Sequence, residues 1–478
     1  MSQSRPKKHV SIGRLRLLYV MGDAVAAVIV WLTYLIYRWT ITNLRPLTIE
    51  DAVVPALLFY MPLIIYPIVS VLVHYLTGFY LNLVQISRLR ELGKTFVSTL
   101  ILSLLLFFFC NLNDIDTVDD YNRYYLFLFT LVLIQFTVSF SIRWLLGIYR
   151  HRLYRKRLLS RRTIVIGTGP QADRIMDELR QQPCQFELIG QVSLTESEHQ
   201  RLSLLGTLDN LEDICQSYDV QSVVVALPSD YRNTELYQII NRLYHYQIDI
   251  QFTPRVYEML TGAVRIRRPD MSPLVNITEQ SMPDWQLCVK RAFDITASSL
   301  ALLITSPLLI LCAIGIRIDS PGPVLFKQDR IGLHGKTFHI LKLRTMCIDA
   351  EPDGHPHLSL PNDPRITRIG RWMRRYRIDE LPQFWNVIMG DISIVGYRPE
   401  RQYFIDQIMK QAPYYCLLYK TRPGITSWGP IRLGYAQGVE TMIERLNYDI
   451  IYIENMSLTE DIKIMLYTIQ VILRGKGQ

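Results

Sequence analysis

Residues 295–316 read ITASSLALLITSPLLILCAIGI, an uncharged stretch in a chain whose residues are 20% charged. A straight helix of this length would measure about 33 Å at ~1.5 Å per residue, which is enough to cross a bilayer. Pro307 lies near the middle, where proline lacks a backbone donor and clashes with the carbonyl of Leu303. Because the Ser306 hydroxyl can satisfy that freed carbonyl inside lipid, the pattern predicts a helix broken at Ser306-Pro307.

Basic residues flank this stretch on both sides, at positions 290, 291, 317, 327 and 330. An excess of Lys and Arg marks the cytoplasmic side of a membrane segment. We therefore expect a re-entrant membrane helix at 291–317 that enters one leaflet and returns. The alternative is a kinked spanning helix, which would leave everything after residue 317 outside the cell.

Four further apolar stretches precede it, at 15–37, 52–76, 95–112 and 124–142. Each is close to the ~20 residues that a transmembrane helix needs. The loops before the first, after the second and after the fourth are basic, whereas the loop after the third is acidic. The charges predict an α-helical membrane bundle with both ends in the cytoplasm. We interpret the basic run at 150–162 as stop-transfer charge, since it lacks the interleaved aromatic residues of nucleic-acid-binding segments.

The overall composition agrees with a membrane part joined to polar domains. Of the 478 residues, 49% are hydrophobic, the net charge is +9 and the mean hydropathy is +0.12. This apolar content excludes a disordered chain. The seven cysteines are scattered and form no CxxC pair, so a disulfide scaffold is not expected.

From residue 163 the chain alternates short apolar strands, at 163–166, 188–192, 222–227 and 248–252, with amphipathic helices. This alternation predicts a parallel, doubly wound sheet. Gly167-x-Gly169-x-x-Ala172 fits the dinucleotide-binding fingerprint, but Gln191 occupies the region where its acidic residue is expected. Two interpretations stay open: weak cofactor binding at Gly167 and Gly169, or a regulatory or structural domain.

A basic segment and an acidic pair follow in the last third of the chain. Asp363-Pro364 predicts a helix start, and the next residues include six arginines, which could contact anionic headgroups or form a phosphate-binding wall. They are Arg365, Arg368, Arg371, Arg374, Arg375 and Arg377. Asp379 and Glu380 precede Pro382, so they are expected at a helix N-terminus. They could be a simple cap, or a carboxylate nucleophile beside a metal-binding carboxylate.

The order of motifs in this region resembles the bacterial sugar transferase family, the monotopic polyprenyl-phosphate hexose-1-phosphate transferases (phosphoglycosyl transferases). The motifs are Lys290-Arg-Ala-Phe-Asp294, Ser306-Pro307, Pro321-Gly-Pro-Val-Leu-Phe-Lys-Gln328, Leu341-Lys-Leu-Arg344-Thr-Met346, Asp379-Glu-Leu-Pro-Gln383, Gly390-Asp-Ile-Ser-Ile-Val-Gly396-Tyr-Arg398-Pro-Glu400 and Arg422-Pro-Gly-Ile-Thr426. The match covers about residues 285–478, and the upstream part is similar to the large members of this family. One departure is Tyr397, where the common pattern has proline.

The resemblance implies three parts: a four-span transmembrane unit at 1–150, a Rossmann-like (CoA-binding-like) domain at 151–275, and a mainly helical α/β transferase domain at 276–478. It implies that Asp379 attacks a UDP-sugar to give a phospho-aspartate intermediate and UMP, and that undecaprenyl phosphate then takes the sugar phosphate. It also implies that Glu380 holds Mg²⁺. The candidate substrate-binding residues are Arg344, Arg368, Arg398, Arg422, Gly424 and Thr426.

The implied partners are a UDP-sugar, undecaprenyl phosphate and membrane lipid, without nucleic acid and with homo-oligomerisation left open. The implied location is the bacterial inner (cytoplasmic) membrane with the catalytic domain in the cytoplasm, where the enzyme would initiate exopolysaccharide, capsule or O-antigen synthesis. The sugar stays open among glucose, galactose and N-acetylated sugars. Two rival functions are a membrane-anchored sugar-nucleotide dehydratase, whose Tyr-x-x-x-Lys pair is absent from the chain, and a non-catalytic regulator of polysaccharide assembly.

Overall fold

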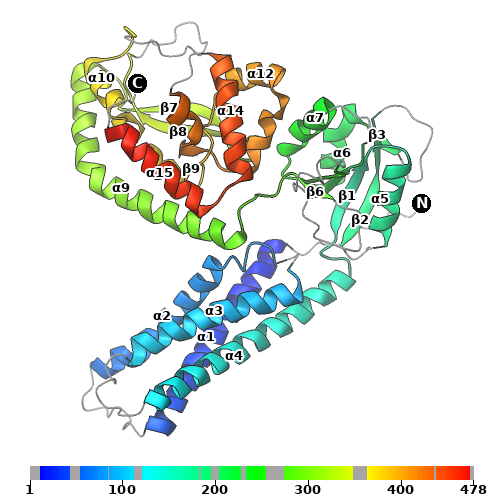
Figure 1. The fold of residues 1–478 in the computed structure, drawn as a ribbon, viewed down its shortest axis with the longest axis vertical. Coiled ribbons are helices and arrows are strands. Elements are labelled where there is room, and N and C mark those ends of the chain that lie inside the picture. The colour runs from blue at the N-terminus through cyan, green and yellow to red at the C-terminus, as the bar shows by residue number, and fades with distance from the viewer. Residues whose placement is uncertain are drawn as a thin grey trace. The chain divides into compact units, whose positions relative to one another are not determined.

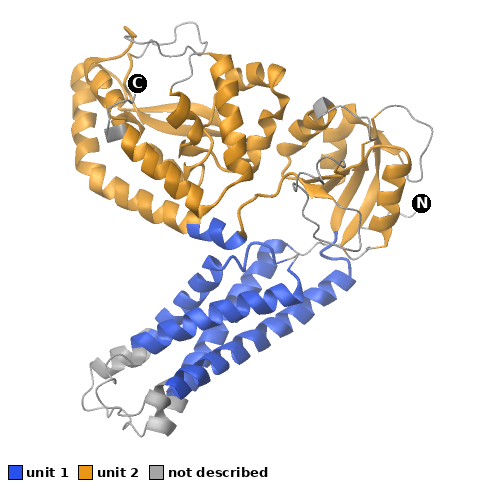
Figure 2. Ribbon diagram, in the orientation of Figure 1, with its two compact units in different colours: residues 1–160, 284–289 blue, residues 161–283, 290–478 orange. Residues whose placement is uncertain are grey.

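The computed structural model describes residues 11–42, 54–83, 86–111, 121–181, 185–194, 204–227, 233–254, 274–347, 363–434 and 438–473. The chain groups into two compact units, residues 1–160 with 284–289 and residues 161–283 with 290–478 (Figure 2). This grouping does not test the predicted three-part division, which stays a prediction.

The first unit consists mainly of four long helices (Figure 1). They are α1 (Ile12–Thr42), α2 (Val54–Leu76), α3 (Arg88–Asn111) and α4 (Tyr121–Arg155). Each corresponds to one predicted apolar stretch. Among the described residues, α1, α3, α4 and the later α9 (Asp284–Asp319) are long and apolar enough to cross a membrane, whereas the part of α2 whose side chains are described, Pro62–Leu76, is a shorter apolar segment. The chain is a membrane protein, and the predicted second span stays a prediction.

A buried polar network joins the helices of this unit and explains the acidic residue within α1. The Asp23 carboxylate accepts hydrogen bonds from Arg143 Nε at 2.8 Å and from the Tyr80 hydroxyl at 2.6 Å. Arg143 Nη1 also donates to Thr95 Oγ1 at 2.8 Å. Charged groups in apolar surroundings are tolerated when they pair with one another in this way.

The middle of the chain forms the predicted parallel sheet. Its strand order is β3-β2-β1-β4-β5-β6, and every neighbouring pair is parallel except β5 with β6. The strands are β1 (Arg161–Ile166), β2 (Phe186–Ser193), β3 (Leu204–Thr207), β4 (Ser222–Val225), β5 (Asp249–Phe252) and β6 (Val275–Asn276). The helices are α5 (Pro170–Arg180), η3 (Leu208–Asn210), α6 (Leu211–Ser217) and α7 (Asn233–Tyr244). The doubly wound prediction is confirmed, although β3 and β6 were not predicted.

The C-terminal block is mainly helical, as predicted, and it contains two small sheets (Figure 1). After α9 come the antiparallel strands β7 (Leu325–Ile331) and β8 (Thr337–Leu343), linked by η4 (Leu333–Gly335), and later the parallel strands β9 (Ser393–Val395) and β10 (Gly424–Thr426). The helices are α10 (Arg368–Arg375), η5 (Ile378–Glu380), α11 (Gln383–Met389), α12 (Gln402–Gln411), η6 (Pro413–Lys420), α13 (Trp428–Leu433), α14 (Val439–Glu454) and α15 (Leu458–Leu473).

Helix α9 runs through Pro307 without the predicted break, and its ribbon is bent (Figure 1). Ser306 Oγ donates to the Leu303 carbonyl at 2.8 Å, which is the hydrogen bond expected from the sequence. Because the hydroxyl satisfies the carbonyl that Pro307 leaves without a partner, the helix can bend there and continue. Leu303 and Ile304, in the turn before Pro307, are 72% and 67% exposed in the protein alone.

The second half of α9 belongs to the core of the C-terminal block. Cys312 and Ile316 pack with Met373 of α10 and Ile378 of η5, and Leu343 of β8 joins the same cluster. The residue that precedes Asp379 is therefore anchored on the apolar helix.

The predicted start of α10 is wrong by several residues. The helix begins at Arg368, and Thr367 Oγ1 accepts a hydrogen bond from the Gly370 backbone N–H. Asp363 instead accepts from both the backbone and the side chain of Arg365. Because the Asp363 carboxylate is bound to Arg365 in this local turn, the next short polar residue, Thr367, caps the helix instead.

Candidate active site

Asp379 and Glu380 lie on the short 3-10 turn η5, directly before α11. Both are buried, at 9% and 7% exposure. Ile378 before them and Leu381 after them pack in the core cluster that includes α9. Arg377 starts the turn with φ of 54°, a left-handed conformation that reverses the chain between α10 and η5. Apolar residues on both sides of the two adjacent carboxylates thus fix the turn to the core.

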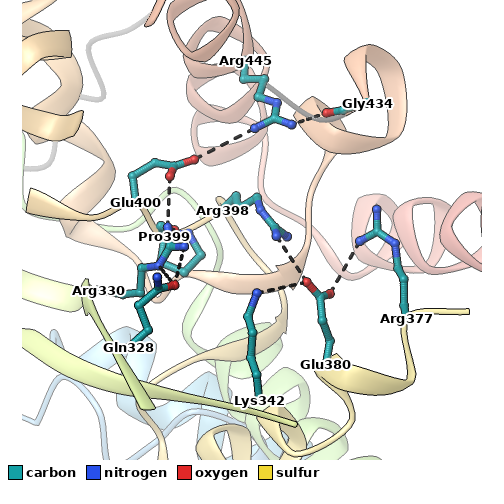
Figure 3. A network of polar contacts seen from close by, with 10 residues as sticks. All are labelled: Gln328, Arg330, Lys342, Arg377, Glu380, Arg398, Pro399, Glu400, Gly434 and Arg445. Carbon is teal, nitrogen blue, oxygen red and sulfur yellow. Dashed lines mark hydrogen bonds and ion pairs between the residues drawn. The ribbon is translucent and has the colours of Figure 1, made fainter. Parts of the chain in front are cut away.

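Three cations from different elements face Glu380 (Figure 3). Arg398 Nη2 lies 3.3 Å and Lys342 Nζ lies 3.4 Å from Glu380 Oε1, while Arg377 Nη1 lies 3.6 Å from Oε2. Lys342 extends from β8, Arg398 follows β9, and Arg377 starts η5. Three positive charges around two carboxylates leave the site net positive, which suits an anionic ligand.

The surroundings shift the pKa values of the two carboxylates in opposite directions. Burial alone would raise the pKa of Glu380, but Lys342, Arg398 and Arg377 together hold it well below its usual range. Burial and the neighbouring Glu380 raise the pKa of Asp379, against the opposing effect of Lys342 and Arg374. Glu380 is therefore ionised at neutral pH, and Asp379 is the more basic carboxylate of the pair.

The donor set fits Mg²⁺ only in part. Among the described residues, no three His, Cys, Asp or Glu side chains converge on one point. Mg²⁺ is usually held by one or two carboxylates together with substrate phosphates and water. Asp379 and Glu380 fit that mode, although the cations around Glu380 disfavour a metal bound without an anionic substrate.

Arg398 is the candidate substrate-binding residue that contacts the pair. Arg344 is placed elsewhere: its Nη1 and Nη2 donate to the carbonyls of Pro321 and Ser320 at 2.8 and 2.6 Å, and it is 6% exposed. These contacts clamp the loop after α9 and do not favour the predicted phosphate contact of Arg344. Arg368 is the first residue of α10.

The three candidates in the Arg422–Thr426 turn make structural contacts. Arg422 Nε donates to the carbonyl of Gly390 at the end of α11, and Thr426 Oγ1 lies 2.6 Å from the Thr468 hydroxyl of α15. A Cβ on Gly424 would lie 2.1 Å from the Gly396 backbone nitrogen, so this glycine permits the close approach of β10 to the end of β9. Their roles in substrate binding stay predictions.

The glycines of the middle domain lie at a tight turn. A Cβ on Gly167 would lie 2.0 Å from the Ala226 carbonyl oxygen, and Gly169 precedes α5 with φ of 97°. The Gln191 side chain donates to the Gly167 carbonyl at 2.6 Å. Gln191 thus binds the turn itself where a ribose-binding acid was expected, and cofactor binding by this domain stays a prediction.

Sequence reasoning did not assign a role to Lys342 or identify Arg377 as a partner of Glu380. Arg377 could have been found, because residues three apart on a turn are neighbours. Lys342 carries a weaker signal, a lone charge between Leu341 and Leu343 in a strand.

Models of two protein families match this chain. The model of the bacterial sugar transferase family matches residues 285–475, and that of a CoA-binding domain matches residues 75–254. A UDP-glucose:undecaprenyl-phosphate glucose-1-phosphate transferase of Escherichia coli (strain K12) is 30% identical, over 68% of this chain and 69% of that protein. This chain belongs to the bacterial sugar transferase family.

The names of two other relatives of this chain contain N-acetylgalactosamine and glucose, respectively. A UDP-N-acetylgalactosamine-undecaprenyl-phosphate N-acetylgalactosaminephosphotransferase of Aeromonas hydrophila is 36% identical, over 54% of this chain and 60% of that protein. A UDP-glucose:undecaprenyl-phosphate glucose-1-phosphate transferase of Caulobacter vibrioides is 43% identical, over 38% of this chain and 69% of that protein. The chain therefore spans less than two thirds of the length of the Aeromonas relative.

One buried acid of this chain lies next to the Arg398 backbone. Asp449 of α14 is 4% exposed, and the backbone N–H of Arg398, the Ser427 hydroxyl, Arg445 and Glu400 face it. Burial raises the pKa of Asp449 to about 7. The folded protein therefore favours the protonated acid in the range where the unfolded chain ionises it.

This difference predicts a pH-dependent loss of stability. As the pH rises from about 4 to about 7, the wild type should lose stability relative to Asp449→Asn, because the unfolded chain releases this proton near its ordinary pKa of about 3.9. Melting temperatures of both proteins in one detergent across pH 4–9 test it, with the exposed Asp406→Asn as control. The difference should grow in favour of the variant up to about pH 7 and then stay constant. A difference that is the same at every pH would contradict this account.

Proposed function

We propose that this chain transfers a sugar-1-phosphate from a UDP-sugar to undecaprenyl phosphate, with release of UMP, as the first step in building a polysaccharide repeat unit. The observation that carries the proposal is the buried Asp379–Glu380 pair faced by Lys342, Arg377 and Arg398. Both substrates are phosphate anions, which a net positive site attracts. The names of the Escherichia coli and Aeromonas relatives share undecaprenyl phosphate and differ in the sugar.

In the first half-reaction, an oxygen of the Asp379 carboxylate attacks the β-phosphorus of the UDP-sugar. The bond between that phosphorus and the oxygen bridging to the α-phosphate breaks, and UMP leaves with the electron pair. The product is a sugar phosphate bound to Asp379 as an acyl phosphate. The raised pKa of Asp379 accords with a more basic, and hence more nucleophilic, carboxylate.

In the second half-reaction, a phosphate oxygen of undecaprenyl phosphate attacks the same phosphorus. The acyl phosphate bond breaks, the Asp379 carboxylate is regenerated, and undecaprenyl diphosphate-sugar is released. UMP leaves before the second anion arrives, so the two phosphate substrates need not occupy the site together. The Arg398 guanidinium and the Lys342 ammonium would balance the negative charge of the UDP-sugar first and of undecaprenyl phosphate second.

Mg²⁺ held by Glu380 would neutralise charge on the diphosphate. The chain's own residues do the remaining work. Arg377 and Lys342 keep Glu380 ionised and oriented, and Ile378 and Leu381 fix the turn on the core beneath it.

We further propose that α9 is re-entrant and that the transferase block lies in the cytoplasm of the bacterial inner membrane. Contacts at both ends of the apolar stretch support this. Before it, Lys290 donates to the Val395 carbonyl and Asp294 accepts from the Ser393 hydroxyl. After it, Ile316 packs in the core cluster that holds Ile378. Both ends thus contact one compact unit, which a helix crossing a ~30 Å hydrocarbon layer could not allow.

Cysteine labelling tests this topology. In a background without the native cysteines, Pro283→Cys and Lys327→Cys should both react with an impermeant reagent from the cytoplasmic side, and Thr117→Cys in the acidic loop should react from the opposite side. Pro307→Leu removes the clash with Leu303 and favours a straight helix, so a fraction of the Lys327→Cys label should move to the far side. Wild-type flanks on opposite sides of the membrane would contradict the re-entrant helix.

The proposed function is tested by UMP release. Purified full-length protein in detergent micelles with undecaprenyl phosphate should release UMP from one or a few UDP-sugars in a panel of glucose, galactose and their N-acetylated forms. The lipid product should carry the sugar of the UDP-sugar that was consumed. Wild-type protein that folds but releases no UMP from any of them would contradict the proposal.

A further inference from the structure

A second polar network holds Pro399 and Glu400, the two residues that follow Arg398 (Figure 3). We call the segment 396–400 the Arg398 loop. Arg330 Nη1 donates to the Pro399 carbonyl at 2.9 Å and to Glu400 Oε2 at 3.1 Å. Arg445 of α14 lies 4.0 Å from the other oxygen of Glu400. The Arg330 and Glu400 side chains are only 16% and 13% exposed. The ion pair between them is therefore largely shielded from solvent.

Side chains from one face of the β7–β8 hairpin take part in two polar networks, the one around Glu380 and the one around Glu400. Phe326 pairs with Lys342 and Arg330 with Phe338 in the antiparallel register, so Lys342, Gln328 and Arg330 extend from the same face. Lys342 contacts Glu380, while Arg330 contacts Pro399 and Glu400. The hairpin therefore fixes the catalytic turn and the Arg398 loop relative to one another.

All three nitrogens of the Arg330 guanidinium donate hydrogen bonds at this place. Its Nε and Nη2 donate to Gln328 Oε1 at 3.1 and 2.7 Å, which orients Nη1 toward the loop. The Ile331 backbone N–H also donates to the Glu400 carbonyl at 3.2 Å. A lysine at position 330 could not make these contacts together, because its single ammonium lacks the planar fork.

We propose that Arg330 and Glu400 form a positioning pair that holds the Arg398 guanidinium in place to bind the diphosphate of the nucleotide-sugar. The pair does not contact substrate, and it acts by fixing the backbone on the C-terminal side of Arg398. This inference rests on the proposed function, because it gives Arg398 the diphosphate as its ligand. Loss of the pair should weaken nucleotide binding more than it slows the chemical step.

A double-mutant cycle with Arg398 separates this role from a general structural one. Glu400→Ala should raise the KM for the UDP-sugar by about tenfold and change kcat by less than about threefold. In an Arg398→Ala background, the same substitution should change KM by less than about twofold, because its target is gone. The milder Glu400→Gln, which keeps the side-chain volume, should show a smaller loss with the same dependence on Arg398. Glu444→Ala, exposed on α14, is the matched control and should leave KM unchanged.

Calorimetric binding of UDP to the same full-length variants supplies a readout that does not depend on turnover. UDP affinity should fall about tenfold in Glu400→Ala and should not fall further when Arg398→Ala is already present. If Glu400→Ala and Arg398→Ala lower the UDP affinity independently, so that their effects add in the double variant, the proposed positioning pair is wrong. Wild-type protein that binds UDP but releases no UMP from any UDP-sugar would instead overturn the proposed function, and the binding cycle would still decide between positioning and structure.

Discussion

Asp379→Asn is expected to lower the rate of sugar-phosphate transfer by at least about a thousandfold, because an amide cannot form the acyl phosphate on which both half-reactions depend. The substitution keeps the shape of the side chain, so the turn anchored by Ile378 and Leu381 should stay folded. UMP release from the preferred UDP-sugar, with and without undecaprenyl phosphate, measures the loss.

The matched control for this variant is Asp329→Asn, which changes an exposed aspartate of β7 and should keep full activity. A melting temperature of Asp379→Asn close to that of the wild type would show that the loss is chemical. Appreciable turnover by a folded Asp379→Asn protein would show that another group is the nucleophile.

Glu380→Gln is expected to have the next largest effect, a loss of about a hundredfold or more in kcat/KM, for two reasons that act together. It removes the carboxylate proposed to hold Mg²⁺, and it removes the negative charge that Lys342, Arg377 and Arg398 all face. The Mg²⁺ concentration needed for half-maximal rate should rise as well. Rates measured across a Mg²⁺ titration for both proteins test both effects.

Chelation distinguishes the two reasons. Excess EDTA should stop the wild-type reaction and added Mg²⁺ should restore it, whereas Mg²⁺ should restore little activity to Glu380→Gln. Full wild-type activity in excess EDTA would refute the metal role and leave the three cations as the explanation for the loss.

Local patterns predicted the features that depend on neighbouring residues in the chain. The Pro307 clash and the Ser306 hydroxyl act within one helical turn, and the structure contains the predicted hydrogen bond to Leu303. The apolar strands of the middle domain likewise predicted the parallel sheet, because strands buried on both faces have a distinctive composition. Strands β3 and β6 lack such a pattern: β3 reads Leu-Leu-Gly-Thr at an edge of the sheet and has no fully buried residue, and β6 has only two residues.

The contacts of charged residues could not be predicted in the same way. Arg344 and Arg398 both stand in arginine-bearing motifs, yet Arg344 donates to two backbone carbonyls and Arg398 faces Glu380. Lys342 and Glu380 are 38 residues apart in the chain, and Asp23 and Arg143 are 120 apart. Only tertiary packing selects which of many possible partners a charged side chain meets.

A covalent sugar phosphate on Asp379 would be detected by the mass of the protein after incubation with its UDP-sugar and Mg²⁺ in the absence of undecaprenyl phosphate. We expect that a fraction of the wild-type protein gains the mass of one sugar phosphate. The added group should map to the peptide containing Asp379 and disappear when undecaprenyl phosphate is added. Asp379→Asn should gain nothing. Wild-type protein that turns over rapidly in the full reaction, yet never gains this mass under acid quench, would contradict the account and indicate direct transfer between the two substrates.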